Sequence, residues 1–131
     1  MKIRVISKSK YEMPGYATYY SAGMDIRANL ESEIVLKPFE RTVLKTGSYP
    51  EIPVDFEVQV RPGSGGTINN GVIVLNSPDK INADYRGEVC IIRINLAGKN
   101  FVISDGERIS QMIIAKQQKA DWMKLDSLIV T

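Results

Sequence analysis

The residues that could do chemistry gather in the segment KINADYRGE, residues 80–88. Its composition predicts the tip of a tight hairpin followed by a strand, and it presents an acid, a phenol and a guanidinium side by side as Asp84, Tyr85 and Arg86. Asn82 stands just before them, at a position that could hold a water-activating carboxylate. Because a neutral amide does not accept a proton near pH 7, the segment has the composition of a site without an evident general base.

The chain of 131 residues contains no histidine. Histidine is the commonest general base and metal ligand, so its absence excludes Ser-His and Cys-His mechanisms. Any catalysis must use carboxylates, hydroxyls, backbone amides or a bound ion. The single cysteine, Cys90, lies in the apolar run EVCIIRINL, where we expect a small buried side chain rather than a reactive thiol.

The composition predicts one globular domain over residues 1–131. With 44% hydrophobic residues, a chain of this length buries about two thirds of its unfolded surface. The net charge is +2 and no dense run of Lys and Arg occurs, so no nucleic-acid partner is expected. No apolar run approaches the roughly 18 residues of a membrane span, and MKIRVISKSK is too charged for a signal peptide. We therefore expect a cytoplasmic protein with no membrane partner.

The elements that must position these residues are short β-strands. Runs rich in Val and Ile alternate with joints of Gly, Pro, Asn, Asp and Ser, at intervals of about 8 to 15 residues, which predicts an all-β sandwich or barrel. In residues 55–61 the apolar side chains alternate with polar ones. Residues 88–96 are almost continuously apolar, so we expect both faces of that strand to be covered, with another chain as one possible cover. The expected strands are 2–6, 24–28, 33–37, 41–45, 55–61, 71–75, 88–96, 100–104 and 108–115.

Four stretches in order resemble motifs of the trimeric dUTPases, a family that splits dUTP into dUMP and pyrophosphate. They are SAGMDIRA (21–28), VRPGSGGT (60–67), GVIVLNSPDKINADYRGE (71–88) and GERISQMI (106–113), and they look like the first four of the family's five motifs. The resemblance implies a distorted jelly-roll β fold, a homotrimer, and three sites at subunit interfaces that bind a uracil deoxynucleotide. It implies no protein ligand for a metal, since Mg²⁺ would be held only through the phosphates of the substrate.

By resemblance, the hairpin from Asn76 to Tyr85 is the uracil pocket. Backbone N–H and C=O groups of the turn would pair with the edge of the base, and Asn76 would help to present them. Tyr85 would lie against the deoxyribose, where a ribose 2′-hydroxyl would clash. The resemblance therefore implies selection of uracil and of deoxyribose at one turn.

The second and fourth motifs would bind the phosphates. The hydroxyl of Ser64 and the backbone N–H of Gly65 could form an anion-binding nest, and Gln111 would donate to a phosphate oxygen. Asp25 matches a family carboxylate with a mostly structural role. Arg108 is expected in an ion-pair network at a subunit interface.

Three departures from the family pattern predict a weakened site. Asn82 stands where the family has the carboxylate that orients and deprotonates the attacking water, a task worth about 10² to 10⁴ in rate. Gly63 stands where the family has an arginine for the phosphates. The Gly-rich C-terminal arm is absent, since the chain ends at DWMKLDSLIVT. Asp79, in place of a usual glycine, is the one nearby candidate for a relocated base.

These departures lead us to expect a dUTPase-fold homotrimer with a degraded active site and no catalytic residue intact. Such a protein would be impaired or inactive and reused as a structural or binding module. Two examples are a phage particle component, which would be located in the virion, and a nucleotide-sensing adaptor with a protein partner. The alternative is an active dUTP diphosphatase that uses Mg²⁺.

Overall fold

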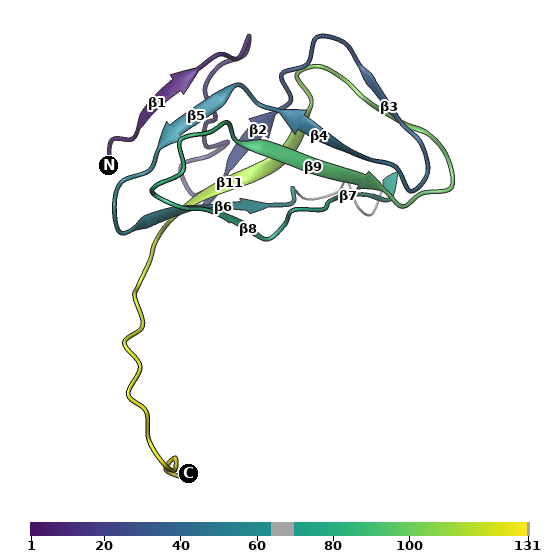
Figure 1. Cartoon of the computed structure of the whole chain (residues 1–131). Helices are drawn as coiled ribbons and strands as arrows, with labels where there is room; N and C mark the ends of the chain where they lie inside the picture. Colours follow the sequence, from purple (N-terminus) through teal and green to yellow (C-terminus); the bar gives the residue numbers. More distant parts are fainter. Residues whose placement is uncertain (64–69, 131) are drawn as a thin grey trace.

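The computed structural model describes residues 1–63 and 70–130, and eleven β-strands lie in these ranges (Figure 1). The largest sheet has four strands in the order β2-β11-β6-β8, and every neighbouring pair is antiparallel. Its strands are β2 (Met24–Arg27), β6 (Phe56–Arg61), β8 (Asp79–Ile81) and β11 (Arg108–Lys116). An irregularity in the pairing of β11 with β2 falls between Arg108 and Ser110.

The other strands form one three-stranded sheet and two ribbons. The three-stranded sheet has the order β4-β9-β7, and the ribbons pair β1 with β5 and β3 with β10. The strands of this second set are β1 (Arg4–Ser7), β3 (Ile34–Leu36), β4 (Arg41–Lys45), β5 (Ser48–Glu51), β7 (Val72–Val74), β9 (Cys90–Asn95) and β10 (Phe101–Ile103). The all-β jelly-roll expectation is confirmed by this arrangement.

A single hydrophobic core joins the two larger sheets. Val58 and Val60 of β6 point into it beside Ile91 of β9, and all three are fully buried. The alternation expected in residues 55–61 is therefore confirmed, because side chains of a strand point to opposite faces. Strand β9 differs from expectation: its inward face is buried, whereas Ile92 and Ile94 on the other face are only half-buried. Nothing in the described part of this single chain covers that second face completely.

All nine expected strands are present, and two further strands were missed. Strand β5 contains Pro50, and it pairs with β1 in a two-stranded ribbon, where an edge position tolerates proline. Strand β8 falls within the segment expected to be a hairpin tip. That expectation was wrong in its pairing, because β7 pairs with β9 whereas β8 pairs with β6. The chain between β7 and β8 therefore crosses from one sheet to the other.

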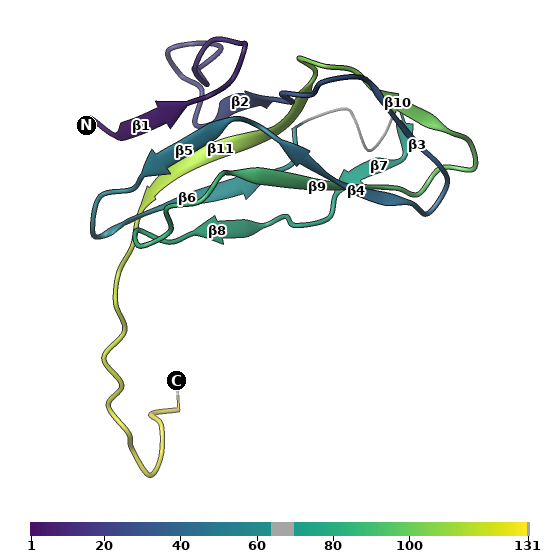
Figure 2. The same ribbon diagram turned by 45° about the horizontal axis from the view of Figure 1, so that its top comes forward.

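The chain leaves the body of the molecule after β11. Gln117 still donates to the backbone carbonyls of Asp55 and Phe56, and residues 118–130 then run away from the sheets without entering a strand (Figures 1 and 2). Their apolar side chains are exposed, among them Trp122 at 91% and Ile129 at 92% of full exposure. No helix within residues 1–63 and 70–130 is long and apolar enough to cross a membrane.

Candidate active site

The crossing between β7 and β8 encloses a cavity of about 310 Å³ with the start of β9. We call it the turn cavity. Its polar lining comes from the segment singled out in the sequence and the turn before it: Asn76, Asp79, Lys80, Asn82, Tyr85 and Glu88. Its apolar lining includes Val43 of β4 and Ile92 of β9, so the cavity offers both apolar side chains and hydrogen-bonding groups. That combination suits a flat base with polar edges.

Asn76 holds the wall of the turn cavity in place. Its side-chain oxygen accepts a hydrogen bond from the backbone N–H of Ile92 at 2.9 Å, and its amide nitrogen donates to the carbonyl of Cys90 at 3.2 Å. The backbone N–H of Leu75 also donates to Ile92, at 2.7 Å. Asn76 thus presents the turn, as expected, by fixing it to β9.

Tyr85 is a fixed wall of the same cavity. Its hydroxyl donates to the carbonyl of Glu88 at 2.8 Å, and its backbone N–H donates to the carbonyl of Asn82 at 3.1 Å. A Cβ placed on Gly87 would come within 2.5 Å of the Tyr85 hydroxyl, so the ring lies directly over Gly87 and a side chain there would displace it. The ring remains 43% exposed and can contact a ligand.

Two carboxylates line the turn cavity, and they have different roles. Glu88 accepts hydrogen bonds from the backbone of Gly47 at 2.8 Å and from the hydroxyl of Tyr49 at 3.3 Å, which commits both oxygens to the fold. Asp79 is exposed, and it accepts from the backbone of Lys80 at 2.8 Å and weakly from Asn76 at 3.4 Å. Asp79 is therefore the carboxylate of this cavity that a solvent molecule can reach.

Cys90 also lines the turn cavity but is not a nucleophile there. Burial, followed by the nearby charge of Glu88, raises the pKa of its thiol. The group therefore stays protonated at neutral pH, which agrees with an unreactive thiol. The side chain is only half-buried, so the expectation of a buried residue was wrong.

A second cavity, of about 300 Å³, lies beside β11. We call it the β11 cavity. It is lined by Asp25, Pro62, Gly63, Val72, Val74, Arg93, Arg108, Ile109, Ser110 and Gln111. No residue is shared with the turn cavity, so a single chain keeps the turn segment 76–88 apart from the described residues of the first, second and fourth motifs.

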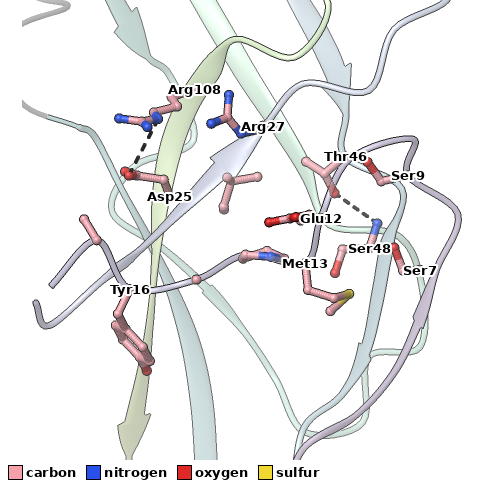
Figure 3. Close-up of a pocket in the computed structure, with 14 residues that line it drawn as sticks. Ser7, Ser9, Glu12, Met13, Tyr16, Asp25, Arg27, Thr46, Ser48 and Arg108 are labelled. Carbon is pink, nitrogen blue, oxygen red and sulfur yellow. Dashed lines mark hydrogen bonds and ion pairs between the residues drawn. The ribbon is translucent and has the colours of Figure 1, made fainter. Parts of the chain in front are cut away.

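Asp25 connects the polar groups of the β11 cavity. Its carboxylate accepts a hydrogen bond from the amide of Gln111 at 3.3 Å and lies 3.9 Å from the Nε of Arg108. Figure 3 shows the ion pair bridging the adjacent strands β2 and β11, viewed from a neighbouring pocket that both residues also line. A structural role for Asp25 fits this position. Ser64 and Gly65, expected to bind phosphate, lie outside the described residues.

Sequence reasoning missed Arg93, which the structure places in the β11 cavity. It stands in the apolar run of β9, and the alternation of that strand turns it inward. A charged residue at an inward position of a buried strand was the available signal.

The family model described as dUTPase matches residues 9–131 of this chain. The chain belongs to the dUTPase family. A deoxyuridine 5′-triphosphate nucleotidohydrolase of Finegoldia magna is 43% identical over 98% of this chain and 90% of the relative. The enzyme of the same name from Aquifex aeolicus is 49% identical over 83% of this chain and 73% of the relative.

Solved structures support the fold of this chain. The D95N mutant of the dUTPase from phage phi11 of S. aureus, described with a structural Mg(II) ion, superposes with a TM-score of 0.86 at 20% identity, covering 98% of this chain and 99% of that one. The dUTPase of Staphylococcus bacteriophage 80alpha gives 0.86 at 22% identity, over 98% and 99% of the two chains. Among the described residues of this chain, no group of three or more His, Cys, Asp or Glu side chains could hold a metal.

The comparisons overturn the expectation of a degraded structural or binding module. Relatives 39–49% identical over most of this chain carry the name of the hydrolase, which favours an active enzyme over a pseudoenzyme, an adaptor or a phage particle component. The physical reason lies in the magnitudes. A missing general base costs about 10² to 10⁴ in rate, whereas enzymes accelerate reactions by about 10⁶ or more, so the loss of one group does not abolish catalysis.

Proposed function

We propose that this dUTPase hydrolyses dUTP to dUMP and pyrophosphate. The observation that carries the proposal is the turn cavity, in which Asn76, Tyr85 and the crossing between β7 and β8 form a preorganised wall of hydrogen-bonding groups. The names of the relatives support the same reaction. Uracil pairs with the backbone of the turn, and Tyr85 contacts the deoxyribose.

The complete site is assembled in a homotrimer. In one chain the turn cavity and the β11 cavity are separate, so a nucleotide that uses both takes its base from one copy and its phosphates from another. Two apolar features favour association: the exposed tail of residues 117–130, and a cavity of about 410 Å³ whose lining is mainly apolar. That second feature includes Val5 of β1, Met24 of β2 and Met112 of β11. Burying such surfaces between copies is favourable.

The phosphates are bound by Ser64, Gly65 and Gln111. Gln111 already donates to Asp25, so its amide is held at the mouth of the β11 cavity. The donor set of the described residues does not form a metal cage, and it fits Mg²⁺ that keeps its waters and is held through the phosphates of the substrate. When bound, that ion neutralises phosphate charge.

The attacking water is positioned by Asn82 and loses its proton to Asp79. The amide of Asn82 is exposed in the turn cavity and can donate to or accept from water, although it cannot act as the base. Asp79 lines the same cavity with its carboxylate accessible. Water adds to phosphorus as pyrophosphate leaves, and the proton ends on the carboxylate.

Pyrophosphate release from dUTP with Mg²⁺ tests the function. We expect multiple turnovers with dUTP and at least ten times less with dTTP or UTP, because the turn reads uracil and Tyr85 excludes the 2′-hydroxyl. Release no faster than in a blank, or equal release from all three nucleotides, would contradict the proposal.

A further inference from the structure

Arg93 is the one buried charged residue among those that the structure describes, with a relative exposure of 9%. It lies on the inward face of β9 between Ile91 and Asn95, at a position where the alternation of a strand favours an apolar side chain. Burying a charge costs free energy unless the charge is paired and hydrogen-bonded. A guanidinium at this position therefore needs a reason.

The observed partner of Arg93 uses only some of the hydrogen-bond donors of its guanidinium. The Nη1 of Arg93 donates to a carboxylate oxygen of Glu107 at 2.6 Å, while its Nε is shielded from solvent and has no hydrogen-bond partner among the described residues. An arginine carries five N–H donors in a planar fork. One ion pair uses one side of that fork and leaves donors for another acceptor.

Arg93 shares the β11 cavity with other residues that have hydrogen-bond donors. These residues are Arg108, Ser110 and Gln111. Of the charged side chains in that lining, two are arginines and one is the carboxylate of Asp25, which leaves the lining with a formal charge of +1. A concave site with excess positive charge and convergent donors favours phosphate oxygens.

The rim of the same cavity has no side chain at Gly63. A Cβ built on Gly63 would meet no atom within 4 Å, so this part of the rim is open space. Among the described residues of the cavity, positive charge comes from β9 and β11 rather than from the segment after β6.

We propose that Arg93 binds the phosphate chain of the nucleotide and is the cation that this cavity supplies from within the fold. The assignment rests on the proposed function for its substrate, a nucleoside triphosphate with pyrophosphate as product. Glu107 orients the guanidinium through Nη1, and the remaining donors face an oxyanion in the β11 cavity. A purely structural ion pair is the competing account, and it predicts equal effects of removing either partner.

Calorimetric titration with inorganic pyrophosphate and with a non-hydrolysable imido analogue of dUTP, both with Mg²⁺, tests the assignment. The variants are Arg93→Met, Arg93→Lys and Glu107→Gln, with the exposed Arg41→Met as a matched control. Losing a charge-assisted hydrogen bond should weaken binding of both probes about 10- to 100-fold in Arg93→Met. The affinity of Arg93→Lys for the probes should lie between those of Arg93→Met and wild type, and the affinity of Arg41→Met should equal that of wild type. Glu107→Gln should bind at least as tightly as wild type, because the guanidinium loses a competing carboxylate.

A second-site variant keeps the test decisive if Arg93→Met is unstable. Gly63 lines the same cavity, so Gly63→Arg should recover most of the affinity that Arg93→Met loses. Thermal melting of each variant identifies those that fold. Equal weakening in Arg93→Met and Glu107→Gln, or wild-type affinity in Arg93→Met, would overturn the assignment. Hydrolysis of dUTP is measured separately. If the protein hydrolyses dUTP but Arg93→Met binds pyrophosphate as tightly as wild type, the role of Arg93 is refuted and the proposed function stands. If Arg93→Met loses affinity for the probes but the wild-type protein does not hydrolyse dUTP, the proposed function is refuted and the anion-binding role of Arg93 stands.

Discussion

Asn76 and Ile92 are joined by a hydrogen bond of 2.9 Å, in which the backbone N–H of β9 donates to the side-chain oxygen of the turn. The same asparagine donates to the carbonyl of Cys90. The ladder between β7 and β9 ends at Val74, and beyond it the backbone N–H of Leu75 and the side chain of Asn76 bond to β9 instead. The turn is thereby fixed to β9.

Asn76→Ala should damage substrate binding more than it damages the fold. Removal of the amide leaves a backbone N–H and a carbonyl of β9 without their partner, at a cost of about 1 to 3 kcal/mol. We expect KM for dUTP to rise about tenfold with a smaller change in kcat, measured by steady-state pyrophosphate release. Asn100→Ala, at an exposed asparagine of the loop before β10, is the control and should leave both constants unchanged. An unchanged KM in Asn76→Ala would argue against its role in the turn cavity.

Asp79→Asn should lower kcat by about 10² to 10⁴ with little effect on KM, because it removes the proton acceptor and keeps the shape of the side chain. Asp55→Asn is a matched control on an exposed turn, where the backbone has φ of 72° and asparagine is well tolerated. A kcat of Asp79→Asn within twofold of wild type would show that the proton goes elsewhere.

Asn95→Leu should destabilise the protein by about 2 to 4 kcal/mol. The amide of Asn95 is fully buried and donates to the carbonyls of Leu36 and Lys99 at 2.9 and 2.8 Å, while its oxygen accepts from the N–H of Ala97 at 2.9 Å. Leucine has a similar volume but leaves all three backbone groups unsatisfied. Urea unfolding of wild type and variant measures the difference. Equal free energies of unfolding would show that these groups find other partners.

Asp105 should contribute an acid-sensitive part of stability. The backbone N–H of Leu30 donates to its carboxylate at 2.8 Å and is the largest cause of a pKa lowered from the ordinary value, helped by Tyr11 and Lys10 and opposed by desolvation. Because the pKa is lower in the folded state, the stabilisation is present above the unfolded value of about 3.9 and disappears as pH falls through the folded pKa.

The test is thermal melting of wild type and Asp105→Asn between pH 2 and 7. Wild type should be the more stable protein near neutral pH, and the two melting temperatures should converge below about pH 4. A difference that is constant over the whole range would contradict a contribution from the charge of Asp105.

Deletion of residues 120–131 should weaken the trimer. The deleted segment carries the exposed Trp122, Leu128 and Ile129, which gain most from burial against another copy. Sedimentation equilibrium of full-length and truncated protein measures the change, and we expect the truncated chain to dissociate at concentrations at which the full chain is a trimer. Identical association would place the interface on the body alone.

Arg93 shows where the sequence and the structure part. Its type and its place in an apolar strand are visible in the sequence, but its contact with Glu107 joins residues fourteen positions apart. Its cavity is lined by residues of β2, β7, β9 and β11 and of the segment after β6. The pairing of β8 with β6 rather than β7 was equally hidden, because short strands carry little information about their partners. The amide at Asn82, by contrast, could be identified from the sequence directly, but its effect on catalysis was overestimated. One missing general base lowers the rate without removing positioning or electrostatic stabilisation.

The sequence by itself determined the family, the β class, nearly all of the strands and the identity of the groups in the turn cavity, since local alternation and ordered motifs are properties of neighbouring residues. Only the tertiary structure decided which strands pair, that Asn76 ties the turn to β9, that Asp79 keeps an accessible carboxylate while Glu88 does not, and that the two cavities of one chain are separate. Those outcomes depend on contacts between residues far apart in the chain, and such contacts are selected by the packing of the whole core.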